Sequence, residues 1–180
     1  GTLAQLAGGN SFLCGLRTDG SVKCTNTTVA PGGTFKFIDS GDTVCGVGTN
    51  GIVNCFAGYS EGTVSGFSEV ASSTYYVCSL QTAGTITCTG SLFGTVPSGF
   101  FTAIAGGTHH ACAIESDGDL ACWGDGNYYV EPSTTGPFKA IAAGNTHSCG
   151  LHENGAIECV GFGLGDDPPV GTFVALAVGT

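Results

Sequence analysis

The ten cysteines of this chain fall into five pairs, and the two members of each pair are ten positions apart. An even number of cysteines at regular spacing favours disulfides formed in an oxidising compartment. Structural zinc sites prefer ligands two to four residues apart, so this spacing argues against zinc. The pairs are Cys14 with Cys24, Cys45 with Cys55, Cys78 with Cys88, Cys112 with Cys122, and Cys149 with Cys159.

The pairs mark an internal repeat, because the first cysteines recur after 31, 33, 34 and 37 residues. A three-residue turn ending in glycine lies midway within each pair, which is typical of a β-hairpin loop whose last residue is left-handed. With such a loop at 18–20, Cys14 faces Cys24 in a non-hydrogen-bonded pair, where Cα atoms approach to about 4.5 Å. The spacing therefore predicts one cross-strand disulfide in each hairpin, at 14–24, 45–55, 78–88, 112–122 and 149–159.

The same register predicts packing on both faces of every hairpin. Leu16 and Val22 share the cysteine face, and all four other units carry apolar residues at these positions. The opposite face carries a small residue in each unit, such as Gly15, which would let a neighbouring sheet approach closely. A further strand is expected before each hairpin, at 3–9, 36–41, 68–73, 102–107 and 139–144.

These patterns predict an all-β fold, a five-bladed β-propeller built from repeats of about 31–37 residues with one disulfide inside each blade. We expect residues 1–180 to form a single propeller domain. A sixth copy of the preceding strand occurs at 173–179, and we expect it to close the ring by joining the sheet of the N-terminal hairpin. The alternative is that the chain is a fragment of a larger propeller.

Composition excludes several classes of function. The formal net charge is −10 with only four lysine and arginine residues, so the chain would repel the phosphates of nucleic acid. An anionic membrane surface is equally unfavourable, and no apolar run reaches the ~20 residues of a membrane-spanning helix. We therefore expect no nucleic-acid partner and no direct membrane insertion of this segment.

The repeats resemble those of the RCC1 superfamily of β-propellers. The resemblance rests on Ile141–Leu151 with Glu153–Cys159, and on Cys14–Cys24. Paired cysteines, and Cys122-Trp123-Gly124 in the fourth unit, are most similar to the secreted variant in CRINKLY4-type receptor ectodomains and bacterial secreted repeat proteins. The resemblance implies a propeller, although those ectodomains would have seven repeats. It does not imply one function, because RCC1-type propellers serve several.

Candidate binding residues occupy two adjoining positions before the first cysteine of a repeat. Their type varies from unit to unit while the scaffold repeats, as expected of a binding rim, although the side chains could instead fill gaps between blades. They are Phe12, Tyr75, Tyr76, His109, His110 and His147. Tyr128 and Tyr129 lie in the longest inter-repeat loop, where exposed aromatic rings could anchor a partner.

The sequence shows no other recognisable chemistry, and we expect no metal site, no cofactor and no enzymatic activity. No catalytic motif is present, and no cysteine is left as a nucleophile if all five pairs close. Carboxylates at 117–119 and 166–167 do not match a calcium-binding loop, and we expect solvated turns there. Asn26 begins a glycosylation sequon, as in a secreted glycoprotein.

The sequence thus predicts a secreted or extracellular binding module that recognises a protein or peptide partner through one propeller rim. It would serve as a receptor ectodomain or as a secreted binding or inhibitory protein. A carbohydrate-binding propeller and a structural surface repeat are the two alternatives. The carbohydrate alternative expects equivalent pockets around the ring, whereas the rim residues differ between units.

Overall fold

The computed structural model of the protein describes residues 2–8, 12–25, 33–41, 44–55, 65–91, 94–125, 136–161 and 168–179. These residues form five antiparallel sheets of three strands each, and no helix occurs among them. Each sheet has an inner, a middle and an outer strand in chain order. The inner strands are β1 (Leu3–Gly8), β4 (Phe35–Ser40), β7 (Phe67–Ser72), β10 (Phe101–Gly106) and β13 (Phe138–Ala143).

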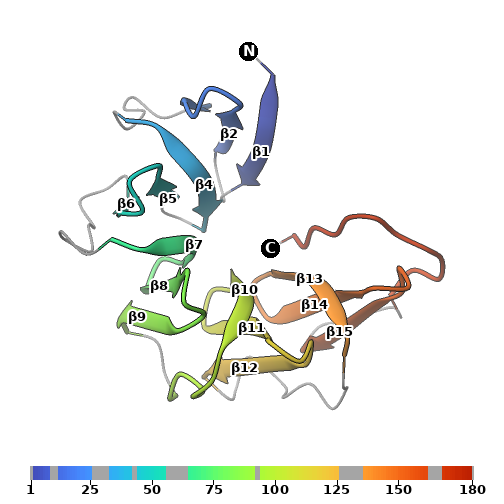
Figure 1. Ribbon diagram of the computed structural model, residues 1–180. Coiled ribbons are helices and arrows are strands. Elements are labelled where there is room, and N and C mark those ends of the chain that lie inside the picture. Colours follow the sequence, from blue (N-terminus) through green and yellow to red (C-terminus); the bar gives the residue numbers. More distant parts are fainter. Residues whose placement is uncertain are drawn as a thin grey trace.

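The middle and outer strands form the disulfide-bearing hairpins. The middle strands are β2 (Leu13–Arg17), β5 (Val44–Gly48), β8 (Tyr76–Gln81), β11 (His110–Glu115) and β14 (His147–His152). The outer strands are β3 (Val22–Cys24), β6 (Val53–Cys55), β9 (Ile86–Gly90), β12 (Leu120–Gly124) and β15 (Ile157–Gly161). In Figure 1 the five sheets follow one another around an arc, and each inner strand contacts the next in chain order. The predicted all-β fold of five blades is confirmed.

The hairpin register is as the cysteine spacing predicts. Cys14 lies opposite Cys24 and Leu16 lies opposite Val22, and the other four hairpins have the equivalent pairing. All ten cysteines form the five expected disulfides. The bridged Cα atoms are 3.9–4.0 Å apart, somewhat closer than the expected separation. One disulfide therefore links the middle and outer strands of every blade.

The inner strands of the four later blades begin one residue earlier than expected. Phe35 pairs with Gly48, and the pairing then skips Lys36 so that Phe37 faces Val47. The same irregularity follows the first residue of every inner strand. Such a bulge re-aims the side chains around it, and it lets the phenylalanine lie in the core.

The core lies between the blades. Phe35 and Ile38 of the second blade form one cluster with Cys14, Leu16 and Val22 of the first. In blades two and five the small residue on the other face of the hairpin makes room for a phenylalanine of its own blade, rather than only for a neighbouring sheet. A Cβ atom on Gly46, for example, would lie 2.7 Å from Cδ1 of Phe35.

The expected closing strand at 173–179 is not found, because the N-terminal sheet contains only β1, β2 and β3. The segment instead follows the fifth blade. Phe173 donates its N–H to the carbonyl oxygen of Gly155 at 2.8 Å, just as Phe35 does to Gly20. Leu3 and Leu6 remain 55% and 58% exposed, whereas the equivalent Phe35 and Ile38 are buried. The segment 173–179 therefore follows blade five in the position that the next inner strand would take, although it forms no strand itself (Figure 1).

Candidate functional site

A small pocket lies where the inner strands end and turn into the middle strands. We call these turns, residues 73–75, 107–109 and 144–146 with Ser40 and Gly41, the pocket rim. The pocket has a volume of about 80 Å³. That volume suits a few waters or one small polar group, whereas drug-sized ligands need roughly 300 Å³ or more. Its lining comes from all five blades and from Val178 in the C-terminal segment, and it is rich in Ser, Thr and Gly.

Glycines of the pocket rim allow neighbouring blades to approach closely. A Cβ atom on Gly107 would lie 2.4 Å from the carbonyl oxygen of Gly144, and one on Gly41 would lie 2.7 Å from that of Ser72. Real side chains are not found at such separations from backbone atoms. The small residues that end each inner strand in the sequence therefore bring backbone polar groups together around the pocket.

Two of the predicted binding residues lie buried between blades. Tyr76 is 2% exposed, and its hydroxyl proton is shared between two acceptors, the carbonyl oxygens of Gly107, at 2.7 Å, and of His110. His110 is fully buried, and its Nε2 lies 2.7 Å from Oγ of Ser148 in the next blade. These side chains join one blade to the next, so a partner cannot reach them in this structure.

Burial also changes the acid–base properties of both groups. Desolvation raises the pKa of Tyr76 far above its ordinary range, so the phenol stays a hydrogen-bond donor. Desolvation, with smaller contributions from His147 and His109, lowers the pKa of His110 to about 4. The imidazole is consequently neutral at physiological pH.

The remaining predicted rim residues are accessible to different degrees. Tyr75 is 49% exposed and stacks on His109, with ring centroids 5.1 Å apart and planes at 21°. These rings directly follow Thr74 and Thr108, which line the pocket. His147 is half-buried, and Phe12 packs against the core between blades one and two. The structure thus brings Tyr75 and His109 together at the edge of the pocket.

Two carboxylates within the inner strands β4 and β7 were not anticipated from the sequence. Oδ2 of Asp39 accepts hydrogen bonds from N and Oγ of Ser72, at 2.7 and 3.2 Å. Desolvation raises the pKa of Asp39 to about 6 and also raises the pKa of Glu69. Glu69 accepts a hydrogen bond from N of Ile104 at 3.2 Å. No repeated residue type marks these positions, so a single sequence offers no signal for them.

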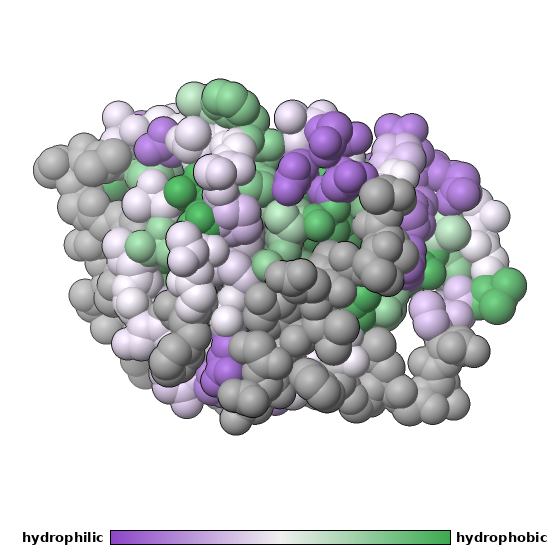
Figure 2. Space-filling model, turned by 90° about the horizontal axis from the view of Figure 1, so that it is seen from below, coloured by the Kyte–Doolittle hydropathy of each residue, from purple (hydrophilic) through white to green (hydrophobic). Residues whose placement is uncertain are grey.

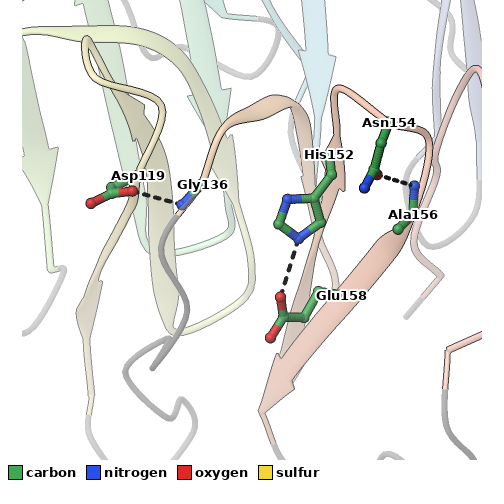
Figure 3. A network of polar contacts seen from close by, with 6 residues as sticks. All are labelled: Asp119, Gly136, His152, Asn154, Ala156 and Glu158. Carbon is green, nitrogen blue, oxygen red and sulfur yellow. Dashed lines mark hydrogen bonds and ion pairs between the residues drawn. The ribbon is translucent and has the colours of Figure 1, made fainter.

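The opposite ends of the blades carry the hairpin loops, residues 18–20, 49–51, 82–84, 116–118 and 153–155, which we call the hairpin rim. The second loop residue accepts a hydrogen bond from the N–H two residues on in four blades, as Asn154 does from Ala156 at 2.9 Å (Figure 3). Figure 3 also shows Asp119 accepting from N of Gly136 at 2.6 Å. In the same view, Nε2 of His152 lies 3.2 Å from Oε2 of Glu158. The carboxylates of 117–119 are therefore turn residues that bind backbone N–H groups.

The remaining features of the described residues give no second candidate. On the face seen in Figure 2, the coloured atoms show apolar residues in separate areas among polar ones. Among the described residues, no group of three or more His, Cys, Asp or Glu could hold a metal ion. Nor does this part of the chain contain a helix with the length and hydropathy needed to cross a bilayer. Asn26, Tyr128, Tyr129 and the carboxylates at 166–167 lie outside the described residues.

Comparison with known proteins identifies the repeat and the fold. Residues 101–129, which include all three strands of the fourth blade, match the regulator of chromosome condensation (RCC1) repeat. The fold is similar to the WD40 ectodomain of the Arabidopsis thaliana receptor kinase ACR4, with a TM-score of 0.82 and 23% identity. That match covers 98% of this chain and 72% of the ectodomain. A search of the curated proteins finds no match.

Two further structures extend the comparison. The entire ectodomain of the Physcomitrella patens receptor kinase CR4 has a TM-score of 0.81 and 27% identity, with 98% of this chain and 56% of that chain covered. Prp20p of Saccharomyces cerevisiae, studied for its binding to Gsp1p and histones, has a TM-score of 0.68 and 15% identity. The match covers 89% of this chain and 58% of Prp20p. The chain therefore has an RCC1-like propeller fold and spans somewhat over half the length of these two proteins.

Proposed function

We propose that this RCC1-like, disulfide-bridged propeller is an extracellular module that recognises a protein or peptide partner through its pocket rim. The observation that carries the proposal is the exposed Tyr75–His109 stack beside a polar pocket, on blades that are each tied by a disulfide. Aromatic side chains on rigid scaffolds are common anchors of protein interfaces. The ectodomain neighbours and the five disulfides support an extracellular setting.

The pocket rim favours a protein partner over a sugar or a small molecule. The pocket is too small to enclose a sugar ring, and its mouth differs from blade to blade rather than repeating. A polypeptide can instead cover several unlike turns at once and insert one side chain. The net charge of −10 would favour partners with basic surfaces.

The test is a peptide-display selection against the oxidised protein, followed by affinity measurements on the enriched peptides. Changing Tyr75 and His109 to serine removes the exposed stack, and we expect Kd to rise at least tenfold. Phe100→Ser is the matched control, because Phe100 is a 63% exposed aromatic residue beside the hairpin rim. We expect this control to bind within twofold of the unchanged protein.

Two outcomes would contradict the proposal. One is a selection that enriches no binding peptide. The other is a set of peptides whose affinity falls with Phe100→Ser but not with the Tyr75 and His109 substitutions. The second result would move recognition to the hairpin rim.

A further inference from the structure

We propose that the central pocket binds the ammonium group of a lysine side chain from the protein partner. The inference rests on the proposed function and assigns the chemistry of one contact within it. It follows from the acceptors in the pocket wall, from a carboxylate directly behind that wall, and from the size and charge of the site.

The pocket wall offers hydrogen-bond acceptors. Oγ of Ser40 is shielded from solvent and has no hydrogen-bond partner among the described residues. Thr108 and Asn145, whose side chains are hydrogen-bonded to each other, also line the pocket. Hydroxyl and amide oxygens accept hydrogen bonds, and an ammonium group has three N–H donors and no acceptor. A lysine head group is therefore complementary to this wall.

Asp39 supplies negative charge behind the wall. It directly precedes Ser40 in the chain and accepts hydrogen bonds from N and Oγ of Ser72, and both serines line the pocket. Burial raises the pKa of Glu69, and the negative charge of Asp39 adds to that rise. No lysine or arginine of the described chain lines the pocket. A cation from a partner would thus meet an uncompensated carboxylate in a partly desolvated site, where charge interactions are strong.

Size and surroundings also suit lysine. A pocket of about 80 Å³ holds an ammonium group and its last methylene groups. The rings of Tyr75 and His109 beside the pocket could cover the rest of the aliphatic stem. The overall charge of −10 would steer a basic group towards the protein.

The experiment is an NMR titration of the ¹⁵N-labelled, oxidised protein with acetyl-Gly-Lys-Gly-amide and with its neutral counterpart, acetyl-Gly-norleucine-Gly-amide. We expect the lysine peptide at pH 7.5 to shift the amide signals of Thr74, Thr108 and Asn145 with a Kd at least tenfold lower than the norleucine peptide. An arginine peptide serves as a second comparison, and we expect it to bind more weakly because a planar guanidinium is larger.

Asp39→Asn removes the charge but keeps an oxygen that can accept from Ser72. We expect the tenfold preference for lysine to fall below threefold in this variant, and its dispersed NMR spectrum would verify folding. Asp117→Asn is the matched control, since it removes one carboxylate at the hairpin rim. This variant should keep the full preference.

The pH dependence gives a second readout. Because burial raises the pKa of Asp39 to about 6, affinity for lysine should fall at least threefold from pH 7.5 to pH 5 as the carboxylate is protonated. Glu69 and Tyr76 also face this region, His109 lies on the pocket rim, and His147 directly follows it in the chain. Any pH dependence that remains in Asp39→Asn belongs to these other groups.

Equal binding of the lysine and norleucine peptides, or no shift of the three pocket signals, would overturn the inference. So would calcium chloride alone shifting those signals at micromolar concentration, because the pocket would then be a metal site. A peptide selection that depends on Tyr75 and His109 but shows no enrichment of lysine would also overturn it, while leaving the proposed function standing. A selection without binders would contradict the proposed function itself.

Discussion

The two ends of the blades are joined by different kinds of hydrogen bond. At the hairpin rim, the N–H of the first residue of an inner strand donates to the loop glycine carbonyl of the preceding blade. This bond recurs from Phe35 onwards at N···O distances of 2.7–3.1 Å. At the pocket rim, the joints use side chains that change from blade to blade. Tyr76 donates to backbone carbonyls, His110 meets Ser148, and Ser73 donates to the carbonyl of Thr108.

The two kinds of contact therefore have different consequences for the sequence: the backbone bonds hold neighbouring blades together, and the side-chain contacts allow the residues of the pocket rim to vary. The backbone bonds do not depend on most side chains. They restrict only the glycine that ends each hairpin loop and the phenylalanine that begins the next inner strand. Side-chain joints must be chosen one pair at a time, and the neighbouring exposed positions are free to differ. The side chains of the pocket rim can therefore vary while the hairpin rim repeats, which fits the recognition role that we propose for the pocket rim.

The strongest test of the comparison is a substitution at a hairpin-rim glycine. Gly51 has a φ of +77°, and a Cβ atom there would lie 2.9 Å from N of Gly66. We expect Gly51→Val to lower the free energy of unfolding by about 3 kcal/mol, through backbone strain and a damaged joint. Urea unfolding of the oxidised protein measures this. Asn50→Asp keeps the acceptor for N of Ile52 and should change stability little. A loss below 1 kcal/mol in Gly51→Val would show that the backbone bonds of the hairpin rim do not hold the blades together as we infer.

The next test uses pH, because two buried groups at or near the pocket rim titrate in opposite senses. The depressed pKa of His110 makes protonation favour the unfolded chain, so its contribution to stability is lost as pH falls from about 6.5 to about 4. The raised pKa of Asp39 makes ionisation favour the unfolded chain. The buried carboxylate therefore lowers the free energy of unfolding above pH 6, and this loss is recovered as pH falls from about 6 to about 4.

The two effects should nearly cancel in the unchanged protein. Asp39→Asn should expose the His110 effect, a loss of about 2–3 kcal/mol between pH 6.5 and 4. His110→Gln should show the opposite slope. Urea unfolding at a series of pH values checks both, with Asp117→Asn as the hairpin-rim control. Parallel profiles for all these proteins would refute the assignment of these shifts.

A smaller effect is expected from one side-chain joint. Tyr76→Phe keeps the buried ring but removes the donor to the Gly107 and His110 carbonyls. We expect a loss of about 1–2 kcal/mol in the free energy of unfolding, since buried acceptors are left without that donor. Tyr75→Phe is the neighbouring control and should be neutral. If both variants were neutral, the side-chain joints would not contribute to blade docking.

The smallest effect is expected at the exposed stack. Tyr75→Ser should alter the free energy of unfolding by no more than about 0.5 kcal/mol, because the ring is half exposed and outside the core. Thermal unfolding followed by circular dichroism is sufficient to measure it. A loss above 1.5 kcal/mol would show that the stack supports the fold rather than a partner.

The hairpin rim could be predicted from sequence because its requirements repeat. Cysteine spacing and the loop glycine together specify strand pairing, and Cys14 does lie opposite Cys24. The closing strand at 173–179 was predicted wrongly, because repetition reveals what kind of strand a segment is but not which sheet it joins. Its pattern is that of an inner strand, and it lies against blade five accordingly.

The pocket rim could be predicted only in part. Sequence located the two variable positions, but their side chains divide between the interior and the surface. Tyr76 turns into the blade interface, while Tyr75, one residue earlier, faces out. Alternation along the chain cannot assign the buried side at a turn, where strand periodicity ends. Asp39 could not be predicted from the sequence, because its hydrogen-bond partner, Ser72, lies 33 residues away in the next blade.

The bond from an inner-strand N–H to the preceding loop carbonyl also bears on how such chains can evolve. Because this bond joins main-chain atoms, blades that become neighbours after a repeat is duplicated or deleted can form the same bond. Gene-level gain or loss of one unit would then need no compensating change at the hairpin rim. Only the side-chain contacts around the pocket would have to be selected afresh, so the number of blades and the binding surface can diversify at different rates.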